Sequence, residues 1–241
     1  MTDQAHAKFA PSSCSIWKEC NASVDFPAEP KEQYVIDAAQ WGTEVHEYAA
    51  NHLKVMGGSP FPKHWTPEQC SDAKLCIDEY CKHVHPLAQT EVKLFSKRWP
   101  TLLFGTIDAI WENPSGNINI VDLKTGLRGV SADENAQLLC YAFLASENFP
   151  DAETFTCRII QPRRYYTAKY AYTRERVEAF AETIQAAIES PPQFTAGSHC
   201  EYCNGRSRCS VLHNSLFRLL AEAEQRGLCT TNLAGKNELN Y

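Results

Sequence analysis

The chain has 241 residues, of which 44% are hydrophobic and 22% are charged, and its formal net charge is -6. These values are typical of a globular protein with one domain, or one domain and a small appended module, and they exclude a largely disordered chain. No segment approaches the roughly 18 consecutive apolar residues that span a membrane, and the first twenty residues lack the basic start and apolar centre of a signal peptide. We therefore expect a cytoplasmic protein with no membrane partner.

The negative charge argues weakly against nucleic-acid binding, because proteins that bind phosphate usually carry a basic surface. A local basic stripe can coexist with a negative total, although most such residues are solvated surface charges. Candidates for a stripe are Lys93, Lys97, Arg98, Arg158, Arg163, Arg164, Lys169, Arg206 and Arg208.

Two helices are predicted after a turn-rich N-terminal segment. Over residues 38–56 apolar side chains recur at helical spacing, which predicts an amphipathic helix. A second helix is predicted over residues 66–85, because Thr66 is a favourable N-cap, Pro67 suits the first helical position and Gln69 completes a capping box.

The rest of the chain predicts a mixed sheet with further helices. Strands are expected over residues 90–96, 102–112, 117–124, 154–161 and 165–172, and helices over 135–147, 173–189 and 211–226. The segment ENPSGN between the second and third strands predicts a hairpin turn. The expected fold class is α/β in the sense of an α+β mixed sheet, in a single domain over 1–241 with its core at about 38–190 and a polar tail at 227–241.

A pair of charged residues marks the third predicted strand. Asp122 and Lys124 are two residues apart, so both side chains point to one face of the strand. The hairpin can bring Asp108 of the preceding strand opposite them, and carboxylate oxygens are the ligands that Mg²⁺ and Mn²⁺ prefer. The alternative is that the two aspartates cap strand ends and that Lys124 is an ordinary surface residue.

The neighbouring helices strengthen the first alternative. Gln137 and Tyr141 are four residues apart on a predicted helix and therefore share a face. His46 lies on the first predicted helix, where its imidazole could add a nitrogen ligand, although a lone helical histidine is more often structural.

The ordered set of these residues resembles the RecB-like branch of the PD-(D/E)xK nucleases, which includes CRISPR-adaptation nucleases, AddB-type nuclease domains and related phage exonucleases. The resemblance covers about residues 12–213. It is carried by Gly42-Thr43-x2-His46, Glu91, Gly105-x2-Asp108, Asp122-x-Lys124 and Gln137-x3-Tyr141. The fold that it implies is a restriction-endonuclease-like core with a C-terminal cysteine segment.

The resemblance also implies roles for these residues. It implies a Mg²⁺ or Mn²⁺ site formed by His46, Asp108, Asp122 and the carbonyl group of Leu123. Lys124 is implied to be catalytic, Gln137 and Tyr141 to position DNA or the lysine, and Glu91 to be a supporting acid. The family pattern also allows a recombination or helicase partner and a homo-oligomer.

Three closely spaced cysteines near the C-terminus predict a second metal site. Cys200, Cys203 and Cys209 supply three thiolates, and a closed site needs a fourth ligand. His213 would complete a local zinc site, whereas Cys20 would connect the two ends of the chain in a four-thiolate cluster.

The resemblance favours Cys20 and a structural 4Fe-4S cluster, and Cys14 is a poorer candidate for the upstream ligand. Such a cluster would connect about residues 12–24 with 197–213. The remaining cysteines are expected to be small buried apolar residues. These are Cys70, Cys76, Cys81, Cys140, Cys157 and Cys229.

The leading functional hypothesis is a metal-dependent deoxyribonuclease that acts as an exonuclease on single-stranded DNA or duplex ends. The alternative is a non-catalytic nucleic-acid-binding or adaptor protein with the same fold and a structural zinc site. Retention of both Asp122 and Lys124 favours the enzyme.

Overall fold

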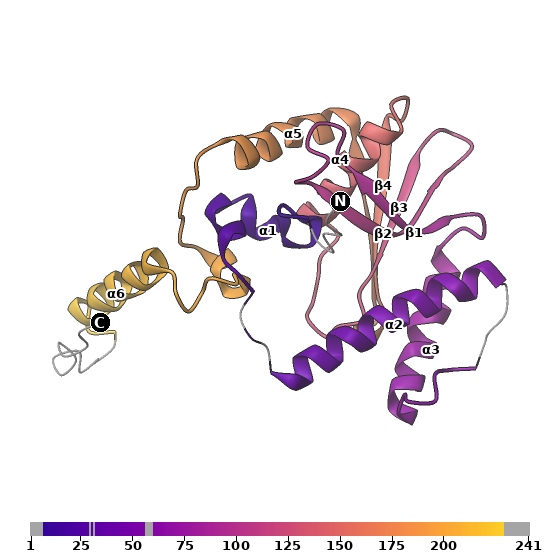
Figure 1. Ribbon diagram of the computed structural model, residues 1–241, viewed down its shortest axis with the longest axis horizontal. Coiled ribbons are helices and arrows are strands. Elements are labelled where there is room, and N and C mark those ends of the chain that lie inside the picture. The colour runs from indigo at the N-terminus through magenta and orange to yellow at the C-terminus, as the bar shows by residue number, and fades with distance from the viewer. Residues whose placement is uncertain (1–6, 29, 31, 56–59, 229–241) are drawn as a thin grey trace.

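A five-stranded mixed sheet forms the centre of the computed structural model, which describes residues 7–28, 30, 32–55 and 60–228 (Figure 1). The strands lie in sequence order, and only β3 and β4 pair in parallel. Their bounds are β1 (Gln89–Phe95), β2 (Phe104–Glu112), β3 (Ile118–Leu123), β4 (Thr154–Gln161) and β5 (Tyr166–Thr173). The prediction of a mixed sheet with helices is confirmed at this level.

The described residues form six α-helices around the sheet, together with short 3-10 turns. The helices are α1 (Cys14–Trp17), α2 (Gln33–Val55), α3 (Pro67–His83), α4 (Ala136–Asn148), α5 (Arg174–Glu189) and α6 (Ser210–Gln225). The 3-10 turns are Pro11–Ser13, Asn21–Asp25, Pro162–Arg164 and Ser198–Tyr202.

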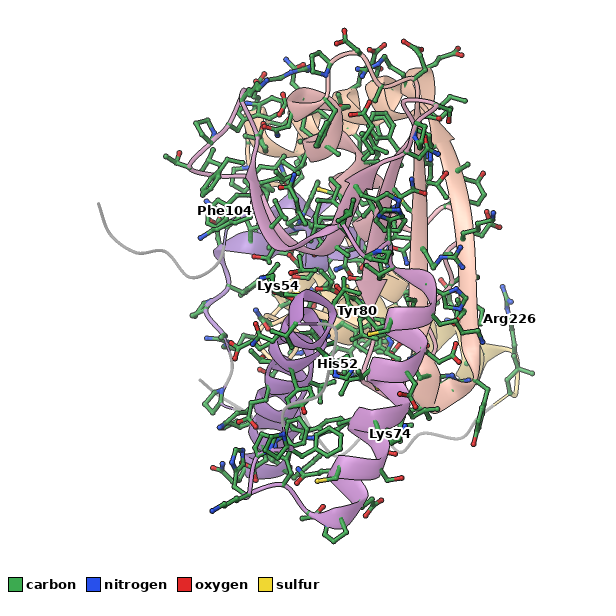
Figure 2. The ribbon with its side chains drawn as sticks, turned by 90° about the vertical axis from the view of Figure 1, so that its right-hand side faces the viewer. His52, Lys54, Lys74, Tyr80, Phe104 and Arg226 are labelled. Carbon is green, nitrogen blue, oxygen red and sulfur yellow. The ribbon has the colours of Figure 1, made fainter. Side chains whose placement is uncertain are left out.

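The sheet separates two apolar cores. Ile118 and Ile120 of β3 face a core that contains α4 and α5. Val121 and Leu123 of the same strand face a second core, which contains α2 and α3. Figure 2 shows α2 and α3 side by side on their face of the sheet. This alternation follows from the period of two along a strand, so each face of β3 needs its own layer of helices.

Side-chain caps fix the starts of three helices. The hydroxyl oxygen of Thr66 accepts a hydrogen bond from the Gln69 amide, and the Gln69 side chain accepts one from the Thr66 amide, which completes the predicted capping box. Asn135 caps α4 by accepting from two backbone amides, and Thr173 caps α5 as predicted.

The sequence prediction differs from the structure near the N-terminus. Helix α2 begins at Gln33 rather than at residue 38. The sequence pattern missed its first residues because they are mostly exposed and carry no apolar periodicity until Trp41. The segment predicted to be only turn-rich forms α1 and two 3-10 turns. It buries Phe9, Cys14 and Trp17 in the core that contains α4.

The C-terminal helix α6 extends from the rest of the described chain, and none of its residues is buried (Figure 1). Of the predicted polar tail at 227–241, the structure describes only Gly227 and Leu228, and Met56 at the predicted end of the first helix also lies outside the described residues. None of the described helices has the length and apolar character needed to cross a membrane.

We expect Trp17→Ala to lower the free energy of unfolding by about 3 to 5 kcal/mol, as is usual when a fully buried aromatic side chain is removed. Denaturant unfolding followed by circular dichroism measures the change. Tyr34→Ala is the control, because Tyr34 is 69% exposed. Equal stability of the two variants would contradict inclusion of the N-terminal segment in the main core.

Candidate metal and active site

The pairing of β2 with β3 places two carboxylates opposite each other. The ladder ends with Ala109 opposite Val121, and Asp108 and Asp122 are the next residue of each strand beyond that last pair. Both residues are buried, with exposed fractions of 9% and 4%. Two neighbouring buried carboxylates repel each other unless cationic or hydrogen-bond-donating groups surround them.

Asp108 is held by groups from three elements. Its Oδ1 lies 3.1 Å from Nδ1 of His46, on α2, and its Oδ2 accepts a hydrogen bond of 2.6 Å from the amide of Leu123. The hydroxyl group of Tyr80, on α3, donates to the backbone carbonyl of Asp108 at 2.8 Å. The face of the sheet covered by α2 and α3 therefore fixes the orientation of this carboxylate.

Glu91 joins His46 and Asp108 from the edge strand β1. One ligand atom from each of these three residues lies within 4.8 Å of the other two. Glu91 has a φ of +53°, which is uncommon for a residue other than glycine and interrupts the regular course of β1 beside Asp108. A nitrogen and two carboxylate oxygens thus converge at one point, a donor set suited to Mn²⁺ or Mg²⁺.

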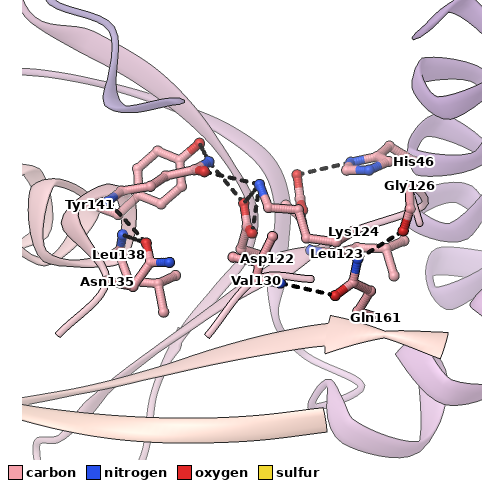
Figure 3. Close-up of polar contacts among 12 residues, drawn as sticks. His46, Asp122, Leu123, Lys124, Gly126, Val130, Asn135, Leu138, Tyr141 and Gln161 are labelled. Carbon is pink, nitrogen blue, oxygen red and sulfur yellow. Dashed lines mark hydrogen bonds and ion pairs between the residues drawn. The ribbon is translucent and has the colours of Figure 1, made fainter. Parts of the chain in front are cut away.

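Asp122 belongs to a second group of contacts, with Lys124 after β3 and with residues of α4 (Figure 3). Lys124 Nζ lies 3.1 Å from Oδ1 and 2.8 Å from Oδ2 of Asp122, and it donates a 2.9 Å hydrogen bond to Oε1 of Gln137. Gln137 Nε2 lies 3.0 Å from Asp122 Oδ1 and 3.1 Å from the Tyr141 hydroxyl group. The motif residues of β3 and α4 therefore form one connected network.

The Oδ2 atom of Asp122 remains available as an acceptor. It is buried and lies close to the Lys124 ammonium group, yet it accepts no hydrogen bond among the described residues. We interpret the 2.8 Å separation as an ion pair without hydrogen-bond alignment. A buried carboxylate oxygen in this state retains the capacity to bind a cation.

The electrostatics of the site favour a positive charge beside the aspartates. Burial lowers the pKa of His46, but the carboxylates of Asp108, Asp122 and Glu91 outweigh it and raise this pKa to about 9. Burial raises the pKa of the Glu91 carboxyl group to about 7, and the charge of Asp108 adds to this effect.

The pKa values of the two aspartates shift in opposite directions. Burial opposes ionisation of Asp108, but His46 and the Leu123 amide outweigh it and lower the pKa of this carboxyl group. Burial raises the pKa of Asp122, partly against the effect of Lys124. Burial also opposes the charge of Lys124, and the adjacent Asp122 outweighs it and raises the pKa of the ammonium group. The charges of the aspartates and of the two bases beside them are therefore strongly interdependent.

The structure divides the predicted site residues into two groups. Glu91 shares the convergent point with His46 and Asp108, whereas the resemblance implied only a supporting role for it. Asp122 contacts Lys124 and Gln137 instead. Leu123 contributes its amide to Asp108, and the implied use of its carbonyl group stays a prediction. Tyr80 was missed because it lies on the apolar face of α3 with Ala73, Cys76 and Ile77, where an aromatic side chain is expected to be a core residue.

Cys20, from the N-terminal segment, lies near the C-terminal cysteines. Burial raises the pKa of the Cys203 thiol, the Gly205 amide lowers it, and nearby thiols of Cys20, Cys200 and Cys209 raise it further. Cys20 and Cys200 are buried. Cys20, Cys200 and Cys209 therefore lie near enough to Cys203 to influence its pKa, while His213 lies on α6 just beyond Cys209. Both the four-thiolate cluster and the zinc alternative stay predictions.

Backbone amides point at two of these sulfur atoms. The Gly197 amide donates to Cys200 Sγ and the Gly205 amide donates to Cys203 Sγ, both at 3.4 Å. Amide donors stabilise negative charge on sulfur, and such hydrogen bonds tune thiolate-bound clusters. The four thiols and their amide donors therefore fit a thiolate-bound metal.

Other candidate residues have structural contacts. Cys76, Cys140 and Cys157 are buried as expected, whereas Cys70 and Cys81 are only half-buried, and Cys229 lies outside the described residues. Cys14, the poorer candidate for the upstream ligand, is buried in the core that contains α4. Within the proposed basic stripe, Arg98 pairs with Glu147 and Arg163 with Asp72. These two arginines are therefore engaged within the protein.

A comparison with known families gives one match over most of the chain. The profile of the family described as "Protein of unknown function (DUF2800)" matches residues 6–235. A solved structure, "Crystal structure of SSO0001", is similar at 16% sequence identity, and the similarity covers 83% of this chain and 84% of that chain. The TM-score is 0.43, which is too low to support an argument about the site.

We expect Asp108→Asn to weaken Mn²⁺ binding at least about tenfold, because the substitution removes one anionic oxygen from the group formed with His46 and Glu91. Isothermal titration calorimetry measures the dissociation constant. Asp151→Asn is the control, since Asp151 is an exposed aspartate outside the site. Unchanged Mn²⁺ affinity in Asp108→Asn, with the fold intact, would remove Asp108 from the metal site.

Proposed function

Since the chain belongs to the DUF2800 family, whose description assigns no function, we propose from its site that it is a Mg²⁺- or Mn²⁺-dependent deoxyribonuclease. The observation that carries the proposal is the joint burial of Asp108 and Asp122 with Lys124, Gln137 and His46 in contact with them. A structural role alone would not call for two buried carboxylates facing each other, because burying like charges is costly.

The proposal includes the PD-(D/E)xK identity of the core. It is supported by the position of Asp108 opposite Asp122 on adjacent antiparallel strands, with Lys124 directly after β3. It is further supported by α4, which follows β3 and returns the chain to the parallel strand β4 while presenting Gln137 and Tyr141.

Each group has a role that its position allows. His46, Asp108 and Glu91, with Asp122 as a further acceptor, would hold a divalent cation, which would supply Lewis acidity toward a phosphate oxygen and lower the pKa of a bound water molecule. The positively charged ammonium group of Lys124 can offset the negative charge developing on the phosphate or orient the attacking water. Gln137 holds the Lys124 ammonium group, and Tyr141 holds Gln137 in turn.

The substrate is proposed to be single-stranded DNA or duplex ends, cleaved exonucleolytically. The support for this choice is the ordered motif set from Gly42 to Tyr141 and its resemblance to RecB-like nucleases. The polarity of cleavage is left open by the proposal.

We also propose that Cys20, Cys200, Cys203 and Cys209 bind a structural 4Fe-4S cluster. The support is that three neighbouring thiols raise the pKa of Cys203, and that amides donate to two of the sulfur atoms. Such a group would connect the N-terminal segment to the C-terminal segment, and its binding energy would contribute to folding.

We expect Lys124→Ala to reduce the rate of DNA cleavage at least about a hundredfold, because it removes a cation positioned for the developing phosphate charge. The Mn²⁺ affinity should change little, since Lys124 is not among the converging ligand atoms. Labelled single-stranded and double-stranded DNA with Mn²⁺ provide the assay. Lys74→Ala is the control, because Lys74 forms only an exposed ion pair with Asp78 on α3. Wild-type protein that cleaves neither DNA would contradict the proposed function, and equal rates in wild type and Lys124→Ala would contradict the role of Lys124.

We expect Cys20→Ser to lower the iron content and visible absorption of anaerobically purified protein, and to lower the melting temperature. The reason is that Cys20 is the one ligand that comes from the N-terminal segment. Cys70→Ser is the control, since Cys70 lies on α3 outside this group. Colourless protein with stoichiometric zinc that is lost in His213→Ala but kept in Cys20→Ser would establish the zinc alternative instead.

A further inference from the structure

Gln161, the last residue of β4, holds the chain segment that follows Lys124. Its side-chain amide nitrogen donates to the carbonyl groups of Gly126, at 2.8 Å, and Arg128, at 2.5 Å. Its side-chain oxygen accepts from the Val130 amide at 3.3 Å (Figure 3). Gln161 is 1% exposed, so both of its amide protons and its oxygen are used in a buried setting.

The segment that Gln161 holds lies between Lys124 and the start of α4, which carries Gln137. Residues 125–135 follow Lys124 directly and lead to the cap of α4, where Gln137 begins the helical part of the network. The amide of Lys124 itself donates to the carbonyl group of Ile160, the residue before Gln161, at 2.8 Å. The end of β4 therefore holds both the backbone of Lys124 and the turn that follows it.

Two arginines after Gln161 add contacts to the same segment. Arg163 donates to the carbonyl group of Thr125 at 3.2 Å, and Arg164 donates to that of Leu127 at 2.8 Å. Arg163 is partly exposed and Arg164 is exposed, so water can replace their contacts. Gln161 differs because its own side chain is buried and bonds three backbone groups of the segment at once, whereas each arginine bonds one.

We infer that Gln161 is a positioning residue for the reaction: it fixes the path of residues 125–130 and so keeps the Lys124 ammonium group between Asp122 and Gln137. This inference rests on the proposed nuclease function. Gln161 touches neither the two aspartates nor the converging ligand atoms, so it acts through Lys124. A misplacement of about 1 Å in a catalytic group can cost about a hundredfold in rate, which sets the size of the expected effect.

The test compares Gln161→Leu and Gln161→Glu in the full chain. Leucine removes all three hydrogen bonds, while glutamate keeps the size and the acceptor oxygen and lacks the amide donors when ionised. Gln185→Leu is the matched control, because Gln185 is a glutamine of the exposed face of α5 that bonds only to Glu189. The measurements are kcat and KM for DNA cleavage, the Mn²⁺ dissociation constant, and hydrogen exchange at the amides of residues 125–130.

We expect both Gln161 variants to exchange faster at residues 125–130 and to lose about 10- to 100-fold in kcat, with KM and Mn²⁺ affinity within about threefold of wild type. A purely structural role would change KM, metal affinity and global stability together, and that result would overturn the inference. Faster exchange with unchanged kcat would also overturn it while leaving the nuclease function intact.

The experiment gives an interpretable result whether or not the wild-type protein cleaves DNA. Wild-type protein without DNA cleavage would contradict the proposed function, and with it the positioning role. The exchange measurement would still report whether Gln161 holds residues 125–130. If Gln161→Leu fails to fold, Gln161→Glu carries the test, because it preserves the volume of the buried side chain.

Discussion

Two buried carboxylates facing each other across β2 and β3 are the constraint on which the rest of the site depends. Asp108 and Asp122 cannot both be ionised in an apolar interior unless positive charge is supplied nearby. The chain supplies one cationic partner to each: His46 to Asp108 and Lys124 to Asp122. The acids beside His46 and Lys124 raise the pKa of each of these bases. Each base therefore stabilises the charge of its aspartate, and each aspartate stabilises the charge of its base.

The helices that support the two aspartates lie on opposite faces of the sheet. His46 is carried by α2, which packs with α3 on the face of the sheet that contains Val121 and Leu123. Gln137, which holds Lys124, is carried by α4 on the other face. The site is therefore assembled only when both helical layers are docked on the sheet. Within the assembled core, the buried polar groups satisfy one another, which offsets the cost of their burial.

Sequence periodicity predicted the local part of this arrangement and missed the non-local part. The placement of Asp122 with Lys124, of Gln137 with Tyr141, and the cap at Thr66 follow from strand and helix periods that span a few residues. The approach of Glu91 to His46 depends instead on a positive φ in an edge strand, which no local pattern indicates. Gln161 was missed for a related reason: nothing near it in sequence shows that its three partners lie in the segment 126–130.

The cysteine site shows how far protein contacts alone can prepare a metal site. Asn21, next to Cys20, donates to the carbonyl groups of Ala187, Ser190 and Pro191 and accepts from the Gln193 amide at 2.6 Å. These bonds tie the N-terminal segment to the end of α5, just before the other three cysteines. At Gly205 a Cβ atom would overlap the Phe26 ring, so glycine is needed for the two segments to approach. Because the segments already meet through these contacts, metal binding would reinforce a contact that the chain has formed rather than create it.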